Sequence, residues 1–315
     1  MSNDSPKLSR RQALQCLAYG GGTLFALSSG VLAPVDLAAA AAHPPATDLG
    51  TLLFVQISDT HIGFHKDANP DVSATLAESI AYVNALPAQP QMIIHTGDIT
   101  HLSKPEEFDV AQSLLGGFRT KELHAVPGEH DVADPTVSEF FNRFGKPSRG
   151  KGYYSFDHSG VHFVALINVL QAKDGGAGYL GDEQLAWATA DLESRSSSTP
   201  IVVFAHMPLW SVYDAWGWRT SDSARLTDAL RRFGSVTVLN GHIHQIAQKV
   251  EGNITFHTAR STAFPQPAPG EGPGPGPLQV PAEQLARMLG VTSVSLRAHP
   301  RSLALSDTTL AEAST

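Results

Sequence analysis

The chain has 315 residues, of which 42% are hydrophobic and 17% charged, a balance that fits a globular protein with a sizeable core. The formal net charge of -8 argues against the basic stripe that nucleic-acid-binding proteins need, so we expect no nucleic-acid-binding surface. It does not exclude a small anionic substrate, because a metal centre supplies positive charge locally. The single cysteine, Cys16, permits no disulfide within the chain, so stability must come from the core.

The N-terminus has the pattern of an export signal. Arg10 and Arg11 precede a weakly apolar stretch at residues 13–33, and an alanine run at 38–42 offers small residues to a signal peptidase. The paired arginines indicate the twin-arginine route. A membrane anchor is the alternative, but the stretch is short and glycine-rich and would span a bilayer poorly. We therefore expect a cleaved signal at residues 1–42, handled by the twin-arginine export machinery, no stable membrane anchor, and a periplasmic or secreted protein.

Beyond a linker at residues 43–50, short apolar runs alternate with segments of helical spacing. The apolar runs, each typical of a strand buried on both faces, are residues 52–57, 92–94, 123–126, 201–204 and 236–239. Helices are predicted at residues 72–83, 105–115, 182–195 and 222–232. This alternation indicates an α/β protein with at least one sheet covered on both sides.

Antiparallel pairing is expected as well. The runs at residues 153–156 and 161–167 flank a turn and predict a β-hairpin, and a second hairpin is expected around Gly252. Two further runs, at residues 291–296 and 302–305, are predicted as closing strands.

One segment stands apart in composition. Residues 265–281 are so rich in proline and glycine that they exclude a helix or a central strand and predict a long loop. No internal repeat is visible, and we expect a single domain over residues 51–308 that contains this loop.

Polar side chains follow five of the predicted strands, at the point where each strand ends. In chain order these are Asp59 and His61, Asp98, the run Glu129-His130-Asp131, His206, and His242 and His244. Side chains two residues apart in an extended chain point to one side, so Asp59 and His61 can face the same ion. The carboxyl ends of strands are where α/β sheets bind ligands. Apart from His130, the set exceeds the needs of one ion and suits two ions about 3.5–4 Å apart that share a carboxylate.

The order of these blocks resembles the signature of the calcineurin-like metallophosphoesterases. That signature runs Asp-x-His, Gly-Asp, Gly-Asn-His-Asp/Glu, His and Gly-His-x-His, and the match spans roughly residues 52–258. The resemblance implies a four-layer αββα sandwich, in which two mixed β-sheets are flanked by helices. It also implies metal-dependent hydrolysis of a small phosphoester. The compact chain is similar to bacterial cyclic-nucleotide phosphodiesterases, so we expect a phosphodiester ahead of a monoester.

The resemblance also implies a role for each residue of the site. One ion would be held by Asp59, His61, Asp98 and His244, and the second by the bridging Asp98 with Glu129, His206 and His242. His130 would contact the phosphate and act as general acid toward the leaving oxygen, with Asp131 orienting its imidazole. Ligands that mix nitrogen and oxygen without a thiolate suit Mn, Fe or Zn.

Glu129 is where the sequence departs from the family, which has asparagine at this position. A carboxylate in place of the amide leaves two divalent ions with one net positive charge instead of two. We expect either a weaker Lewis acid or a preference for Fe(III) at one position. The alternative is that Glu129 faces away and water replaces it. A non-catalytic or weakly active metal-containing ligand-binding protein of the same fold is the rival function.

Other conspicuous residues have no assigned role at this stage. The aromatic residues after His206 are expected to pack a long loop, with a substrate-stacking wall as the alternative: Trp210, Tyr213, Trp216 and Trp218. Six histidines are expected to be satisfied or surface groups, two of them on strands near the site: His95, His101, His124, His158, His162 and His257.

Overall fold

The structure, a computed structural model, describes the chain in several segments: residues 24–28, 31–35, 50–132, 137–145, 148, 152–172, 175–297 and 302–313. The chain divides into two units, Met1–Asp48 and Leu49–Thr315. In the first unit, β1 (Leu24–Ser28) and β2 (Val31–Val35) pair antiparallel. The rest of the predicted export signal, with the linker up to residue 49, lies outside the described residues. None of the helices in the described segments is both long and apolar enough to cross a membrane.

The second unit contains two mixed β-sheets. The five-stranded sheet has the order β13-β12-β3-β4-β5, in which β3, β4 and β5 are parallel and β12 and β13 are antiparallel to their neighbours. Its strands are β3 (Thr51–Ile57), β4 (Met92–His95), β5 (Leu123–Ala125), β12 (Gly290–Arg297) and β13 (Ser302–Thr309). Both predicted closing strands are therefore confirmed, and they extend the sheet from β3.

The six-stranded sheet has the order β10-β11-β9-β8-β7-β6, with parallel strands in the middle and an antiparallel hairpin partner at each edge. Its strands are β6 (Tyr154–His158), β7 (Val161–Ala165), β8 (Ile201–Phe204), β9 (Val236–Asn240), β10 (Gln248–Glu251) and β11 (Ile254–Thr258). The two edge hairpins are those that the sequence predicts, and both are confirmed.

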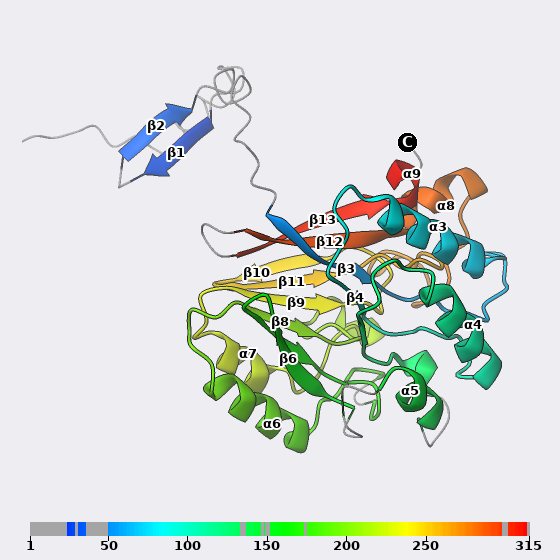
Figure 1. The fold of residues 1–315 in the computed structure, drawn as a ribbon, viewed down its shortest axis with the longest axis horizontal. Coiled ribbons are helices and arrows are strands. Elements are labelled where there is room, and N and C mark those ends of the chain that lie inside the picture. Colours follow the sequence, from blue (N-terminus) through cyan, green and yellow to red (C-terminus); the bar gives the residue numbers. More distant parts are fainter. Residues whose placement is uncertain are drawn as a thin grey trace, which may run out of the picture. The chain divides into compact units, whose positions relative to one another are not determined.

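Helices cover the outer face of each sheet (Figure 1). The five-stranded sheet packs on α3 (Val72–Ala85), α4 (Pro105–Leu115) and α5 (Ser138–Arg143), and the six-stranded sheet packs on α6 (Asp182–Glu193) and α7 (Ala224–Leu230). A third buried cluster lies between the sheets and joins residues of β3, β4, β7, β8 and β12. The predicted four-layer αββα sandwich is thus confirmed.

Successive side chains of a strand point to opposite faces of its sheet, and this alternation fills the layers on both sides. In β8, Val202 and Phe204 point into the cluster between the sheets, whereas Ile201 and Val203 point to the helices. Because both faces are buried, the strand has no polar positions, which is why it appears in the sequence as a continuous apolar run. The sequence did not predict α5, nor α8 (Ala282–Met288) and α9 (Leu310–Ala313), which follow the proline-rich loop and the last strand.

A buried histidine ties the β6–β7 hairpin to α6, away from the strand ends that carry the polar clusters. The Nδ1 atom of His162 lies 2.9 Å from Asp157 Oδ1, and its Nε2 atom lies 2.6 Å from Asp191 Oδ2. Burial by itself would raise the pKa of both carboxyl groups, but the hydrogen bonds with His162 and the charge of Arg195 outweigh it and lower both pKa values. This network is a structural element of the fold.

Replacing His162 with phenylalanine is expected to destabilise the protein by about 2–3 kcal/mol at neutral pH, because charge-assisted hydrogen bonds to a buried partner are lost. Asp157 is half exposed and contributes the smaller share. Both carboxyl groups have lowered pKa values, so their contribution is complete above about pH 4 and is lost as the pH falls further. Melting curves recorded between neutral pH and pH 3 should therefore converge for the two proteins.

His158→Phe is the matched control for this prediction. His158 belongs to the same hairpin, but it bonds the neutral amide of Gln91, with 2.6 Å between Nε2 and Oε1. A constant gap between the wild-type and His162→Phe melting temperatures at every pH would contradict the assignment.

Candidate metal centre

The five polar clusters meet at one edge of the sandwich, just beyond the carboxyl ends of β3, β4, β5, β8 and β9. Backbone hydrogen bonds tie the loops together: Asp59 N donates to Gly97 O at 3.0 Å, and His61 N donates to Asp98 O at 2.9 Å. In the other sheet, Gly241 N donates to His206 O at 2.9 Å. The ends of parallel strands thus bring residues up to 185 positions apart to one place.

The side chains form two groups with one carboxylate between them. Asp59, His61 and His244 offer ligand atoms within 4.8 Å of one another, and so do Glu129, His206 and His242. Asp98 lies between the two groups: its Oδ2 atom is 3.5 Å from His61 Nε2 in the first group and 3.3 Å from His206 Nε2 in the second. The structure therefore brings all seven predicted ligands together, with Asp98 in the bridging place.

Two of the histidines are oriented by backbone carbonyls. His206 Nδ1 donates to Thr96 O at 2.7 Å, and His244 Nδ1 donates to Phe264 O at 2.6 Å. With Nδ1 donating to a carbonyl, each ring turns its Nε2 atom toward the cluster, and loss of the Nε2 proton gives the form that binds metal.

Several buried atoms in the second group lack hydrogen-bond partners in the described structure. His206 Nε2 lies 2.8 Å from Glu129 Oε2, and His242 Nδ1 lies 2.8 Å from Glu129 Oε1. Yet Glu129 Oε2, His206 Nε2 and His242 Nδ1 have no partner in hydrogen-bond geometry. Buried polar atoms are rarely left in this state, and an ion between them would satisfy all three. The residues present thus fit a metal ion, and Glu129 faces the cluster instead of pointing away.

The backbone at the ligands is strained. The φ angles are 53° at Asp59, 41° at His61, 54° at Asp98, 70° at His242 and 55° at His244, all in the left-handed region. Residues other than glycine rarely adopt this conformation, and where they do, the strain often marks a functional site.

Neighbouring glycines allow the chain to come this close. A Cβ atom on Gly128 would lie 2.0 Å from Asp98 Oδ1, and one on Gly241 would lie 2.0 Å from Ser58 Oγ. Gly97 has a φ of 100°, a conformation that glycine adopts without strain, and so lets the chain turn sharply just before Asp98.

The electrostatics of the cluster favour a cation. Burial opposes ionisation of Glu129, but His242 and His206 outweigh it and hold the pKa of the carboxyl well below its usual range. Burial likewise opposes protonation of His206, yet Asp98 and Glu129 raise the pKa of its imidazole well above its usual value. Burial and the neighbouring histidines lower the pKa of His61 far below the usual value. The Glu129 carboxylate therefore stays charged, and it draws positive charge to its neighbours.

Comparison with known proteins agrees with this geometry. The calcineurin-like phosphoesterase family matches residues 52–246. The chain belongs to the calcineurin-like phosphoesterases. It is therefore a metal-dependent phosphoester hydrolase with a buried His/Asp site of the dimetal type.

The relatives of this calcineurin-like phosphoesterase include diesterases. It is 28% identical over 226 residues to the glycerophosphodiester phosphodiesterase GpdQ of Enterobacter lignolyticus, covering 69% of this chain and 79% of the relative. It is 25% identical over 219 residues to a probable cyclic nucleotide phosphodiesterase of Rhodococcus erythropolis, covering 67% and 71%. Among solved structures, a dimetal phosphatase from Danio rerio superposes with a TM-score of 0.64 at 14% identity, covering 83% and 97%. This last likeness concerns the fold.

Two residues of the calcineurin-like phosphoesterase site, His130 and Asp131, make hydrogen bonds other than those expected from the sequence. His130 Nδ1 donates to the backbone oxygen of His101 at 2.7 Å, so Asp131 does not orient the imidazole. Instead, the Asp131 carboxylate accepts hydrogen bonds from the backbone of Ile99, Thr100 and Gly128 at 2.8–3.0 Å. Asp131 therefore braces the loops that carry Asp98 and Glu129. The predicted orienting role is corrected, because a buried carboxylate is drawn to free backbone N–H groups.

His101 is the residue that sequence reasoning missed. It was expected to be a satisfied or surface group, yet its ring stacks on His130 and its Nδ1 atom lies 3.4 Å from His61 Nδ1. Burial, with the nearby charges of His130 and Lys66, lowers the pKa of His101 to about 4, so this imidazole is neutral at pH 7. The only signal in the sequence was its position, three residues after Asp98.

Other conspicuous residues make contacts outside the set of proposed ligands. His95 is buried and bonds Thr60, whereas His257 pairs with Asp307 on β13. Trp218 is fully buried, so packing explains it, while Tyr213 and Trp216 are half buried and contact one another edge to face. Arg219 pairs with Asp214 at 3.0 Å.

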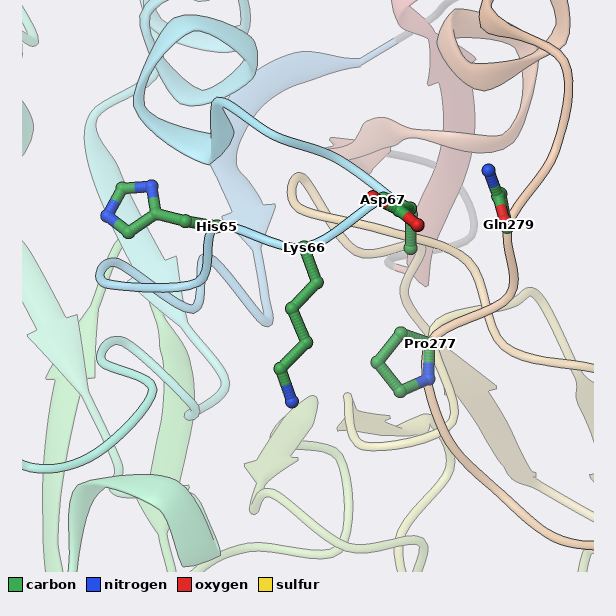
Figure 2. A pocket seen from close by; sticks show the side chains of 6 residues that line it. His65, Lys66, Asp67, Pro277 and Gln279 are labelled. Atoms are coloured by element: carbon green, nitrogen blue, oxygen red, sulfur yellow. The ribbon is translucent and has the colours of Figure 1, made fainter.

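A pocket of about 540 Å³ lies between the segment after His61 and the end of the proline-rich loop. It is lined by His65, Lys66, Asp67, Ala68, Pro277 and Gln279. Figure 2 shows the Lys66 side chain extended between the two segments.

Proposed function

We propose that this protein hydrolyses phosphodiesters in preference to monoesters, at a pair of metal ions held by its seven clustered ligands. The observation that carries the proposal is the set of buried, unpartnered nitrogen and oxygen atoms around the bridging Asp98. The names of the relatives support a diester. The ligands are Asp59, His61, Asp98, Glu129, His206, His242 and His244.

When bound, the ions supply charge neutralisation for the phosphate and a water nucleophile at neutral pH. The chain's own contribution to the chemistry begins with His130. One of its ring nitrogens lies within 4.8 Å of carboxylate oxygens of both Asp98 and Glu129, at the mouth of the cluster. Since Nδ1 is engaged with the His101 carbonyl, Nε2 is the atom that donates a proton to the leaving oxygen.

Activity assays with two aryl esters test the diester preference. We expect the protein, loaded with Mn²⁺, Zn²⁺ or iron in separate samples, to hydrolyse bis(p-nitrophenyl) phosphate with a higher kcat/KM than p-nitrophenyl phosphate. A higher value for the monoester with every metal would reverse the proposed order. No hydrolysis of either ester, by protein shown to hold two metal ions, would favour the rival binding function.

Glu129 determines which metals this centre prefers. Its carboxylate contacts two imidazoles of the second group, so it adds negative charge where the family has a neutral amide. We propose Fe(III) at this position beside a divalent ion, because a trivalent ion restores the charge that the carboxylate removes.

Glu129→Gln keeps the length of the side chain and removes its charge. We expect the iron content of the purified variant to fall and its activity with two divalent ions to rise by several-fold, about one kcal/mol of barrier or less. Metal analysis by mass spectrometry and the EPR spectrum of the iron check this. Full activity of wild-type protein that holds two Zn²⁺ or two Mn²⁺ ions would contradict the proposal of Fe(III) at this position.

We also propose that the protein is exported by the twin-arginine route, on the strength of Arg10 and Arg11 and the apolar stretch after them. Replacing both arginines with lysine should retain the full-length precursor in the cytoplasm, as seen by cell fractionation. Export of that variant at the wild-type level would contradict the proposal.

A further inference from the structure

His101 touches the candidate proton donor through both its backbone and its ring. Its carbonyl oxygen accepts the hydrogen bond from His130 Nδ1 at 2.7 Å. Its imidazole lies flat on that of His130, with ring centroids 4.9 Å apart and 15° between the planes. The carbonyl holds the Nδ1 proton of His130 in place, and the stack fixes the plane of the ring and so the direction of Nε2, the nitrogen whose proton is given up.

The same imidazole also reaches a metal ligand. His101 Nδ1 lies 3.4 Å from His61 Nδ1, while His61 Nε2 faces the carboxylates of the cluster. A histidine that binds metal through Nε2 carries its proton on Nδ1 and needs an acceptor there. The Nδ1 atom of His101 is placed to be that acceptor.

The buried aromatic residue Phe64 packs against the ring of His101. The ring of Phe64 is 1% exposed and meets the His101 ring edge to face, with 5.2 Å between centroids and 89° between planes. His101 is thus wedged between the core and His130, although its imidazole belongs to neither the core nor the ligand set.

We propose that His101 is a positioning residue that holds the metal ligand His61 and the proton donor His130 in one fixed arrangement. The inference rests on the proposed function, since it gives His130 the task of protonating the leaving oxygen. It adds a residue outside the family's signature blocks, and it assigns two separable parts to one side chain: the stack serves His130, and Nδ1 serves His61.

Two substitutions separate these parts, and both keep the backbone carbonyl. His101→Phe retains a flat ring against His130 and removes the acceptor for His61. His101→Asn supplies an oxygen near the position of Nδ1 and removes the stack. His101→Ala removes both. The readouts are metal affinity, by titration into metal-free protein, and kcat for an alkyl and an aryl diester, glycerophosphoethanolamine and bis(p-nitrophenyl) phosphate.

The expected results differ between the variants. His101→Phe should bind metal roughly tenfold or more weakly, within the range typical for loss of a partner behind a ligand. Its kcat at saturating metal should stay close to wild type. His101→Asn should bind metal as wild type does, but lose about tenfold or more in kcat for the alkyl ester and much less for the aryl ester. An alkoxide needs a proton to leave, whereas p-nitrophenolate does not.

His124→Asn controls for the loss of any stacked histidine. His124, on β5, lies flat on Phe156 of β6, with centroids 3.9 Å apart and 10° between planes. This variant should lower the melting temperature without changing metal affinity or the ratio of alkyl to aryl kcat.

Two outcomes would overturn the proposal. In one, His101→Phe and His101→Asn change metal affinity and the alkyl-to-aryl ratio together, as general destabilisation would. In the other, His101→Ala changes neither. Failure of the proposed function is distinguishable, because it would appear as inactivity of the metal-loaded wild type, while the affinity titrations would still report on the contact between His101 and His61.

Discussion

His130→Ala is expected to lower kcat for an alkyl phosphodiester by about 10²–10⁴-fold, with the metal content unchanged. His130 lies beside the bridging Asp98, and its backbone N–H donates to Asp98 Oδ1 at 2.9 Å, a bond that the substitution keeps. Burial opposes protonation of the imidazole, but the charges of Asp98 and Glu129 raise its pKa, which favours the form that can give a proton. We therefore expect the substitution to remove proton donation to the leaving oxygen and to leave metal binding intact.

A comparison of two substrates tests whether His130 acts by proton donation. The deficit should be large for glycerophosphoethanolamine and small for bis(p-nitrophenyl) phosphate, whose leaving group needs no proton. Steady-state kinetics with both esters, beside metal analysis of the same samples, provide the measurement. An equal loss for both esters would assign His130 to phosphate binding, and no loss for either would remove it from catalysis and support a binding protein.

Asp98→Asn is expected to abolish the metal pair. The Oδ2 atom of Asp98 lies between His61 and His206, one from each group of ligands, and its carboxylate is 1% exposed. The amide keeps the shape but loses the charge and one of the two acceptor oxygens. Removing a partner behind a ligand typically costs 10–100-fold in metal affinity, so loss of the bridge itself should exceed about 100-fold.

Calorimetric titration of metal into the apo-protein measures this loss, and the enzyme activity should fall in parallel. Asp182→Asn is the matched control, because the Asp182 side chain is 95% exposed and lies 3.8 Å from Arg225. Binding of two ions to Asp98→Asn with wild-type affinity would show that the carboxylate does not bridge.

Much of the fold was predictable because the sandwich buries its central strands on both faces. Such a strand is a continuous apolar run in the sequence, and β3, β4, β8 and β9 all have this form. The short helix α8 has only seven residues and none of them is buried, so no core-facing side distinguishes it in the sequence from the loop before it. Helix α5 has only six residues, too few to show a period at all.

The order of the polar blocks predicted which residues gather, since each block ends a strand of known direction. It did not predict how they are held. The role of Asp131 depends on backbone N–H groups that are free only in the folded loops, and the stack of His101 on His130 depends on the angle between two loops. Neither the free N–H groups nor the angle between the loops can be predicted from the order of the polar side chains.

The left-handed backbone at five of the proposed ligands has a consequence for how the centre is filled. Strain of this kind costs on the order of 1–2 kcal/mol per residue, and it persists only where the surrounding sheets over-determine the loops. The free energy of folding, and not that of metal capture, then sets the ligand positions, unlike in a zinc finger, where the two are the same process. Ions should therefore be removable and replaceable in the folded protein, so that one preparation can be stripped with a chelator and reloaded with one metal after another.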